Sequence, residues 1–599
     1  MIKLSDFVYK YIDSLKVNHT FVLSGGGCMH LVDSLGKNKN ITYVSCLHEQ
    51  GVAIAAGAYA QYTNNLGSAL VTTGPGSTNA ITGVAAAWVE SIPLLIISGQ
   101  VKRQDISFPN GTRSLGFQEI NIISIVKNIC KYSVTVTDPL SIKYHLEKAA
   151  YEARSYRPGP VWLDIPLDVQ ASMIDERKLK GFLPQPNKTN TISIKNQIRE
   201  VVDLINKSNR PVILAGYGLK LSNAQNIFYR LINKLGIPVL TTWKAIDLLP
   251  ENHRLYCGRP GAIGQRGANF VQQNSDLFIS IGARLDLGQI AYSYKNFARM
   301  AKKIVVDIDQ AELDKLKFEN QLKICTNADI FVKEFLKKIN SIKRSRWNDW
   351  LKRCKDWNNK YPVVLPEYKK QKNYVNTYAL IDMLSNKLRE KDLIVPGSSG
   401  ACSDVFMQAF RVKKGQVILN TPGLGAMGFG LPASIGACIA SGLKRTICIN
   451  GDGGFQLNIQ ELATVSRLKL PIKYFILNNQ GYGSIKTSQR NYFKGFYVAS
   501  GPESGVVLPL ITKVAQAYGI SSIIIKNYED LKKKIDFILN SEGPTICDIS
   551  IDPGEQVMPK LMSQVKKGGV MISKPMEDLW PFQDRKEFKS NMLIPLVDE

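Results

Sequence analysis

The chain has 599 residues and a formal net charge of +26, with apolar and charged fractions typical of a globular protein. At this length we expect two to four domains, and no apolar run reaches the roughly 18 residues that a membrane span needs. The N-terminus lacks the apolar stretch of a signal peptide. The lysines are spread along the chain, which argues against a nucleic-acid partner. Ten scattered cysteines favour reduced thiols in a cytoplasmic protein.

The first segment, about 1–175, alternates short apolar runs with helical patterns. Residues 21–23 lead into a run of three glycines, and residues 68–72 lead into Gly74-Pro75-Gly76. Further buried-strand candidates lie at 93–98 and 161–166. This rhythm predicts a parallel sheet with helices on both faces.

A polar stretch from Pro184 to Asn190 predicts a linker. The middle segment, about 196–345, repeats strand-then-turn units, at 211–215, 277–282 and 304–309. A charged connector of helical character follows at 343–372. We therefore expect an α/β protein of three doubly wound parallel-sheet modules, at 1–175, 196–345 and 373–555, with a tail at 556–599.

The third segment carries the clearest chemical signal. A β-branched run at 446–450 ends at Gly451-Asp452-Gly453-Gly454, and a second run at 474–477 ends at Asn478-Asn479-Gln480-Gly481. Residues 456–469 between them have helical character. A strand–helix–strand unit brings both strand ends to one sheet edge, where open α/β sheets bind ligands. Glycine N–H groups can approach phosphate there, and Asp452 offers the hard oxygen that Mg²⁺ prefers.

The spacing of the two halves, with residues 454–477 between them, resembles the thiamine diphosphate signature of decarboxylases and carboligases. Three more segments match in the same order, at 47–60, 73–79 and 423–432. Together with the three modules, they make the chain similar to the acetolactate synthase-like (large catalytic subunit) branch of thiamine diphosphate enzymes. The modules would then be pyrimidine-binding, central dinucleotide-type and diphosphate-binding.

The resemblance implies that Asp452, Asn479 and the carbonyl group of Gly481 hold Mg²⁺. The remaining implied contacts to thiamine diphosphate are Glu49, Gly397, Ser398, Ser399, Gly425, Met427, Gly451, Gly453, Gly454 and Tyr482. Met427 would be the apolar wedge that bends the cofactor, although an ordinary core methionine is the alternative. The serines and glycine at 397–399 are also simply good turn formers.

Two residues are catalytic candidates by the same resemblance. Glu49 would share a proton with the pyrimidine ring of the cofactor, a task that an apolar pocket favours. The alternative is a glutamate stabilised by the dipole at a helix start. Gln118 matches a polar active-site residue of the carboligases, or else belongs to a surface pair with Glu119.

The sequence departs from the family at the acceptor site. Acetolactate synthases have an arginine at the position of Gly288. They also have a tryptophan in the stretch that corresponds to residues 483–489, and this chain has no tryptophan there. Lys486, Gln489 and Arg490 could instead meet an anionic acceptor, or they could be solvated loop residues. Whether the chain binds FAD stays open, because members of the family that lack flavin have similar glycines at their strand ends.

We therefore expect a thiamine diphosphate- and Mg²⁺-dependent carboligase that decarboxylates a 2-keto acid, with pyruvate as the expected donor, and transfers the acyl unit to a carbonyl acceptor. The alternatives are acyl transfer to a nucleotide-linked keto sugar, simple decarboxylation, C–C hydrolysis, or a silent cofactor-binding protein. The family places the active site between subunits, which implies a homodimer or homotetramer.

Overall fold

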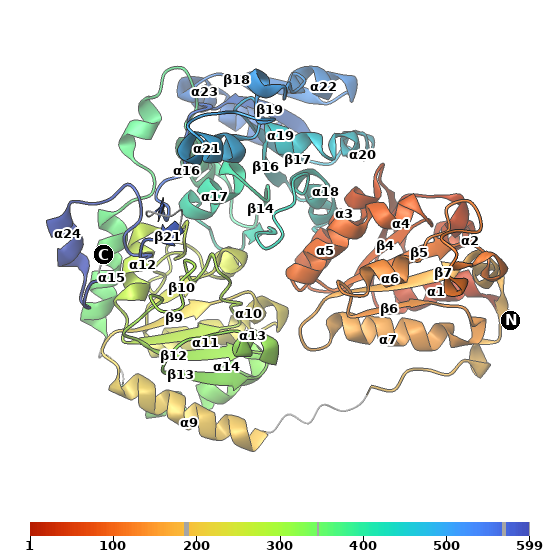
Figure 1. Cartoon of the computed structure of the whole chain (residues 1–599), viewed down its shortest axis with the longest axis horizontal. Coiled ribbons are helices and arrows are strands. Elements are labelled where there is room, and N and C mark those ends of the chain that lie inside the picture. The colour runs from red at the N-terminus through yellow and green to blue at the C-terminus, as the bar shows by residue number, and fades with distance from the viewer. Residues whose placement is uncertain (185–190, 344–346, 566–570, 598–599) are drawn as a thin grey trace.

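The computed structural model describes residues 1–184, 191–343, 347–565 and 571–597, so the predicted linker at 184–190 lies almost wholly outside it. The chain forms three large parallel sheets, each packed against helices (Figure 1). This confirms the predicted fold class of three parallel-sheet α/β modules. In the described part of the chain, no helix is both long and apolar enough to cross a membrane.

The first sheet has the strand order β3-β2-β4-β5-β7-β6. Its strands are β2 (His19–Val22), β3 (Thr42–Ser45), β4 (Gly67–Val71), β5 (Leu94–Gln100), β6 (Tyr132–Thr135) and β7 (Pro160–Pro166). Its main helices are α1 (Leu4–Ser14), α2 (Met29–Lys37), α3 (Glu49–Thr63), α4 (Pro75–Asn79), α5 (Ile81–Val89), α6 (Ile122–Val126) and α7 (Ile142–Arg154). β4, β5 and β7 are buried along their whole length, as expected of central parallel strands.

The central sheet has the order β10-β9-β11-β12-β13. Its strands are β9 (Pro211–Ala215), β10 (Val239–Thr241), β11 (Leu277–Ile281), β12 (Lys302–Asp307) and β13 (Gln321–Cys325). The main helices are α9 (Thr191–Lys207), α11 (Gln225–Leu235), α12 (Arg266–Gln273) and α14 (Ala328–Lys337), and the connector contributes α15 (Asn348–Lys360).

The third sheet has the order β15-β14-β16-β17-β19-β18. Its strands are β14 (Leu393–Pro396), β15 (Val417–Ile418), β16 (Thr446–Gly451), β17 (Ile472–Asn478), β18 (Ser521–Ile525) and β19 (Thr545–Ser550). The main helices are α16 (Thr377–Lys387), α17 (Ala401–Ala409), α18 (Gly430–Ala440), α19 (Asp452–Gln456), α20 (Leu462–Arg467), α21 (Gly483–Tyr492), α22 (Ile511–Ala517) and α23 (Tyr528–Asn540). β16 and β17 are parallel neighbours, with Gly451 opposite Leu477, so both halves of the predicted motif reach one edge.

The helical character predicted at 456–469 is interrupted in the structure. α19 begins at Asp452 and ends at Gln456, and a 3-10 helix at Ile459–Glu461 then leads into α20 at Leu462. The break lies at Asn458, which has non-helical φ and ψ of −137° and 31° and donates a side-chain hydrogen bond to the carbonyl oxygen of Gly428. An asparagine that bonds outside its helix competes with the helical backbone. Leu457, which lies in this break, is 42% exposed.

Small residues let the first and third modules approach closely. α3 packs against α18, and a Cβ added at Gly436 would lie 1.9 Å from the carbonyl oxygen of Ala55. The tail, in contrast, lies on the central module, and it ends with α24 (Arg585–Asn591) beside α12 and α15 (Figure 1). Asn269 donates to the Met576 carbonyl group at 2.6 Å, and the Trp357 indole donates to Asn591 at 3.0 Å.

Candidate functional site

Asp452 joins the two halves of the glycine and asparagine motif. It begins α19 directly after β16, and one carboxylate oxygen accepts the backbone N–H of Gly453 at 2.8 Å. The other oxygen accepts the N–H of Gly481, from the second half, at 3.2 Å. Burial raises the pKa of Asp452 to about 6. A buried carboxylate of this kind is stabilised in its ionised form by a cation, so the surroundings fit a bound metal ion.

Asn479 supplies a second oxygen that lacks a partner. Its side-chain Oδ1 is buried and accepts no hydrogen bond from the described residues. Buried polar atoms are nearly always paired, so this one calls for a ligand. The backbone at Gly481 has φ of +140°, and an added Cβ would lie 2.3 Å from the Ser500 carbonyl oxygen. Carboxylate, amide and carbonyl oxygens at one strand edge are the donors that Mg²⁺ takes.

Glycines shape the cradle around these oxygens. A Cβ added at Gly453 would lie 2.6 Å from the ring of Tyr482, so the tyrosine packs directly over the turn. At the neighbouring strand end, an added Cβ on Gly397 would lie 2.6 Å from Cys402 Sγ and 3.0 Å from Asn450 Oδ1. Backbone this close to the strand edge leaves room for phosphate oxygens only because side chains are absent.

A second loop closes the cradle. The hydroxyl group of Ser398, which follows β14, donates a hydrogen bond to the Ala426 carbonyl group. This bond connects residues 397–399 to the loop before α18. Gly425 in that loop has φ of +66°. Met427 follows it and is 38% exposed, so it is not an ordinary core methionine. The structure therefore gathers the predicted residues of the third module around one sheet edge.

Glu49 is the first residue of α3 and is 7% exposed. Its carboxylate accepts a hydrogen bond from the Asn79 side chain at 3.0 Å. The backbone N–H groups of the preceding residues, Leu47 and His48, donate to Glu461 Oε1 of the third module. Among the described residues, no hydrogen bond joins Glu49 itself to the Asp452 cradle. Sequence reasoning missed the roles of Asn79 and Glu461, although Asn79 ends a matched motif.

Gln118 packs against the turn that follows β4, which contains Thr73 and Gly74. Its backbone has φ of +64°, and its carbonyl group accepts a hydrogen bond from the Thr73 hydroxyl at 3.1 Å. A Cβ added at Gly74 would lie 2.8 Å from the same carbonyl oxygen. Since Gly76 of this turn is next to Glu49, the structure brings the two catalytic candidates to one end of the first module.

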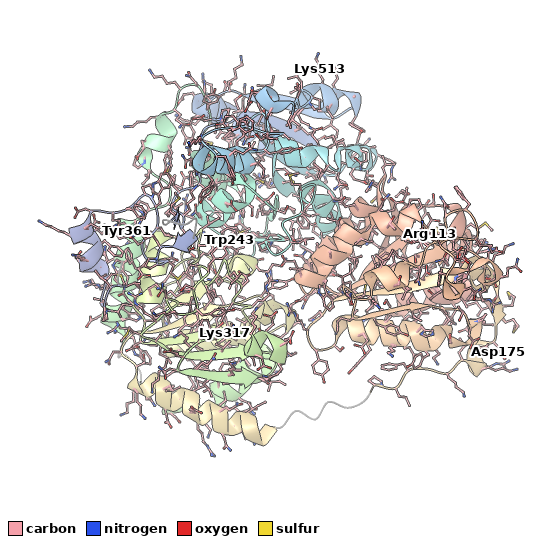
Figure 2. All side chains as sticks on the ribbon, viewed as in Figure 1. Arg113, Asp175, Trp243, Lys317, Tyr361 and Lys513 are labelled. Atoms are coloured by element: carbon pink, nitrogen blue, oxygen red, sulfur yellow. The ribbon has the colours of Figure 1, made fainter. Side chains whose placement is uncertain are left out.

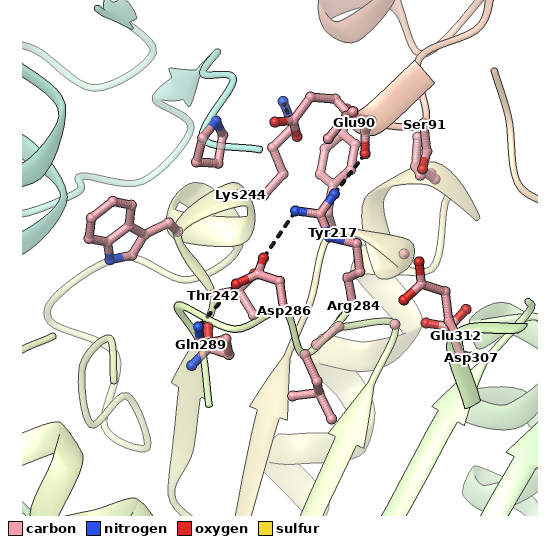
Figure 3. A pocket seen from close by; sticks show the side chains of 18 of the residues that line it. Glu90, Ser91, Tyr217, Thr242, Lys244, Arg284, Asp286, Gln289, Asp307 and Glu312 are labelled. Atoms are coloured by element: carbon pink, nitrogen blue, oxygen red, sulfur yellow. Dashed lines mark hydrogen bonds and ion pairs between the residues drawn. The ribbon is translucent and has the colours of Figure 1, made fainter. Parts of the chain in front are cut away.

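The central module opens into a cavity of about 560 Å³, within the usual range for small-molecule sites. The strand-end glycines Gly218 and Gly282 line it, together with Gly288. Figure 3 shows Lys244 and Glu90 at one end, Asp307 and Glu312 at the other, and Arg284 between them. Burial raises the pKa of Asp307 to about 6. An acid at a strand end beside such glycines is typical of dinucleotide sites, where it contacts a ribose.

The acceptor candidates on α21 have different surroundings. Lys486 forms an ion pair with Glu503, at 3.1 Å. Gln489 accepts from the Ser500 hydroxyl at 2.7 Å and donates to the Val498 carbonyl group at 2.8 Å. Both side chains therefore hold the loop that follows α21. Arg490 does not, because its Nε and Nη2 atoms are buried without a hydrogen-bond partner among the described residues.

The chain has three α/β modules, a glycine-lined strand edge around Asp452 in the third and a buried glutamate that opens a helix in the first. This arrangement is that of the thiamine pyrophosphate enzymes. Residues 2–125 match the family model of the N-terminal TPP binding domain of thiamine pyrophosphate enzymes. Residues 198–336 match the model of their central domain, and residues 398–549 match that of their C-terminal TPP binding domain. The chain belongs to the acetolactate synthase-like family of these enzymes. This confirms the predicted family, the dependence on thiamine diphosphate and membership of the carboligase class.

The similar proteins cover almost the whole chain. An acetolactate synthase large subunit of Cyanidium caldarium is 34% identical over 91% of this chain and 92% of its own length. The large subunit of Lactococcus lactis is 31% identical over 93% and 94%, respectively. A probable large subunit of Methanococcus aeolicus is 32% identical over 92% of each chain.

Proposed function

We propose that the protein is a Mg²⁺-dependent carboligase that decarboxylates a 2-keto acid, with pyruvate as donor, and transfers the acyl unit to a carbonyl acceptor. The observation that carries this proposal is the Asp452 cradle, in which a buried carboxylate lies between both motif halves beside the unpaired Asn479 oxygen. Asp452, Asn479 and the Gly481 carbonyl group would hold the metal ion. The turns at 397–399 and 451–454, with Gly425 and Tyr482, would hold the diphosphate.

The cofactor supplies, when bound, a carbon centre that attacks the carbonyl group of the donor. Glu49 would hold a proton at the pyrimidine ring, and its hydrogen bond from Asn79 fixes the carboxylate for that task. Met427 would support the cofactor between its two rings, which is consistent with an apolar side chain standing exposed in a glycine-rich loop. Gln118 would orient the substrate at the same end of the first module.

The scarcity of proton donors favours carboligation over aldehyde release. The chain has five histidines, and His48, the nearest to Glu49, accepts the backbone N–H of Gln50 through Nδ1 at 3.1 Å. This histidine therefore caps α3. With His48 held in this cap, we expect attack on a second carbonyl group to compete well with protonation of the donor carbon.

The identity of the acceptor is tested by mass spectrometry of the products. Purified enzyme is given thiamine diphosphate, Mg²⁺ and pyruvate, with and without a nucleotide-linked 4-keto sugar. The alternative, acyl transfer to the sugar, is favoured by Gly288, which lines the cavity at the position where the family resemblance implies an arginine that binds a carboxylate. Acetolactate from pyruvate alone supports the keto-acid acceptor, and a sugar product heavier by an acetyl unit supports the alternative. Acetaldehyde as the sole product would contradict carboligation.

We propose FAD as the occupant of the central cavity. The support is the volume of about 560 Å³, the strand-end glycines and the half-buried Asp307 at the end of β12. Heat or acid release of a yellow compound with a flavin spectrum from the purified protein tests this. A colourless protein that gains no flavin during incubation with FAD would contradict it.

We also propose a homodimer or homotetramer of a cytoplasmic protein, with each active site built from the modules 1–175 and 373–555 of different chains. The exposed apolar side chains of Leu47 and Phe117, 50% and 86% exposed near the catalytic candidates, support an interface there. Co-expression of Glu49→Gln and Asp452→Ala subunits tests the arrangement. Hybrid dimers regain one intact site only if sites are shared, so an inactive hybrid would contradict it.

A further inference from the structure

A buried ion pair lies where the three modules meet. Glu90 follows the last residue of α5 in the first module, and Lys244 belongs to the short 3-10 helix Trp243–Leu248 of the central module. Lys244 Nζ lies 3.5 Å from Glu90 Oε2, and the two side chains are 10% and 5% exposed. Both residues line the central cavity (Figure 3). A lysine and a glutamate at such depth stay charged because they are paired.

Lys244 connects this pair to the third module. Its ammonium group also donates to the Asn420 carbonyl oxygen and, at 2.8 Å, to Gln61 Oε1 on α3. The Asn420 side chain donates in return to the carbonyl oxygen of Trp243, at 3.0 Å. Figure 2 shows Trp243 where the central module meets the third. Lys244 therefore holds segments of all three modules together.

Glu90 extends the pair to the loop before α18. Its Oε1 accepts the backbone N–H of Gly423 at 2.5 Å and the hydroxyl group of Thr421 at 3.4 Å. Gly423 lies two residues before Gly425 and four before Met427. Residues 421–429 form turns and irregular structure, so hydrogen bonds to neighbouring segments determine where this loop lies.

The other end of the loop is anchored within the third module. The Ser398 hydroxyl donates to the Ala426 carbonyl group, and the Asn458 side chain donates to that of Gly428 at 2.8 Å. Glu90, in contrast, anchors the beginning of the loop from the first module. The path of the loop 423–428 between these anchors consequently depends on where the Glu90 carboxylate is held.

Lys244 has no substitute as the partner of Glu90. Two other cations lie near the pair, and each has an acidic partner of its own: Lys220 with Asp247 at 2.7 Å, and Arg284 with Asp286 at 3.0 Å. Without the charge of Lys244, Glu90 would be a buried anion with no cation partner, which favours its protonation or its rotation out of the site. Either change removes the charged acceptor of the Gly423 N–H.

We propose that Glu90 and Lys244 are positioning residues for the thiamine diphosphate site, because they hold the loop 423–428 where it contacts the cofactor. This rests on the proposed roles of Gly425 and Met427 as cofactor contacts. The pair acts through the backbone at Gly423 and touches neither the metal ligands nor Glu49. A loop that is already held in its bound conformation loses less entropy when the cofactor binds, and the affinity is higher for that reason.

Calorimetric titration with thiamine diphosphate tests the pair. Mg²⁺ and FAD are saturating in every sample, so that the metal site and the central cavity are equally supplied. We expect Lys244→Met to raise the dissociation constant of thiamine diphosphate about tenfold or more. Glu90→Gln keeps an oxygen for the Gly423 N–H and should weaken binding less than Glu90→Ala. The double variant Lys244→Met/Glu90→Gln should weaken binding by less than the two single changes combined, because no unpaired charge remains.

Lys473→Met is the matched control. Lys473 is also a buried lysine, and its ammonium group donates to the carbonyl oxygens of Ser541 and Gly543 at 2.7 and 2.6 Å. It lies near the beginning of β17, at the end opposite the metal loop. We expect both lysine variants to lower the unfolding temperature, but only Lys244→Met to weaken cofactor binding. An equal loss of affinity in Lys473→Met would overturn the proposal, as would unchanged affinity in Lys244→Met and Glu90→Ala.

Met427→Ala in the same titration tests the cofactor contact on which the proposal rests. Weaker binding in this variant and in the variants of the pair supports both assignments. Weaker binding in Met427→Ala alone overturns the role of the pair and leaves the contact in place. The titration needs no turnover, so it is independent of the carboligase proposal, which pyruvate consumption by the unmodified enzyme tests separately.

Discussion

Glu461 accepts the backbone N–H of His48 at 3.0 Å, one residue before Glu49 begins α3. The same oxygen accepts the N–H of Leu47 at 2.9 Å, and the Thr464 hydroxyl donates to the other oxygen. Burial raises the pKa of Glu461. A buried acid of the third module thus fixes the start of the helix that presents the catalytic candidate of the first.

Glu461→Ala should loosen that helix start. The half-buried N–H groups of Leu47 and His48 lose a charged acceptor, at a cost on the order of 1.5 kcal/mol each. We expect a lower unfolding temperature and a turnover rate reduced about tenfold or more. Glu461→Gln keeps an oxygen that can accept these hydrogen bonds, so its unfolding temperature and turnover rate should lie between those of the alanine variant and the parent. Hydrogen exchange at Leu47 and His48 reports the local effect directly, and unchanged exchange and rate in the alanine variant would show that Glu461 does not position α3.

Glu49→Gln separates chemistry from folding. The amide has the same size and still accepts the Asn79 hydrogen bond, so the fold and cofactor affinity should persist. Turnover should fall by about 10²–10⁴-fold, because the side chain can no longer exchange a proton. Asn79→Ala serves as the companion variant, with a smaller loss expected because the carboxylate remains. Turnover that survives in Glu49→Gln would mean that this glutamate is misassigned, and inactivity of every variant and of the parent would favour a silent binding protein.

Asn479→Ala should lower the stability of the metal-bound enzyme and leave the stability of the metal-free enzyme nearly unchanged. The buried Oδ1 has no partner in the described structure, so its removal costs no hydrogen bond before metal binds. We expect the unfolding temperature of the metal-free variant to stay within about 2 °C of the parent or to rise. The stabilisation by Mg²⁺ with thiamine diphosphate should shrink, since ligand binding stabilises in proportion to affinity. An equal Mg²⁺ response in variant and parent would exclude Asn479 as a ligand.

The sequence was most informative where structure is decided locally. The glycine turn at 451–454 and the turn ending in Gly481 could be predicted because strand periodicity and turn residues lie next to each other in the chain. Contacts between distant segments left no such signal. Nothing around Glu461 indicates that it would meet Leu47, and nothing in the tail indicates that Asn591 would accept from Trp357.

The same limit explains the two expectations that the structure modified. The helix at 456–469 has good periodicity, but Asn458 finds a tertiary partner in Gly428 and breaks it. On α21, charge and polarity alone made Lys486, Gln489 and Arg490 equivalent. Only the fold of the following loop, through Glu503 and Ser500, distinguishes the two that are already paired.

Asp164 should give the enzyme a measurable pH dependence of stability. It is fully buried on β7, its Oδ1 accepts the Ser98 hydroxyl at 2.6 Å, and its Oδ2 accepts the Gln100 amide at 3.0 Å. Burial raises its pKa to about 7. Between the unfolded value, about 3.9, and 7, the folded state holds a proton that the unfolded state has lost, so stability falls as pH rises through this window.

Asp164→Asn isolates this contribution from those of other acids, such as Asp404 and Glu555, whose pKa values desolvation also raises to about 7. The amide does not ionise, so the advantage of the parent over the variant in urea midpoint should be largest near pH 5. It should shrink as pH rises to 8, where the parent buries a charge and the variant does not. The measurement is the difference between the two midpoints at each pH, in the same buffers and salt. A difference that stays constant from pH 5 to 8 would mean that Asp164 ionises equally in the folded and unfolded chain.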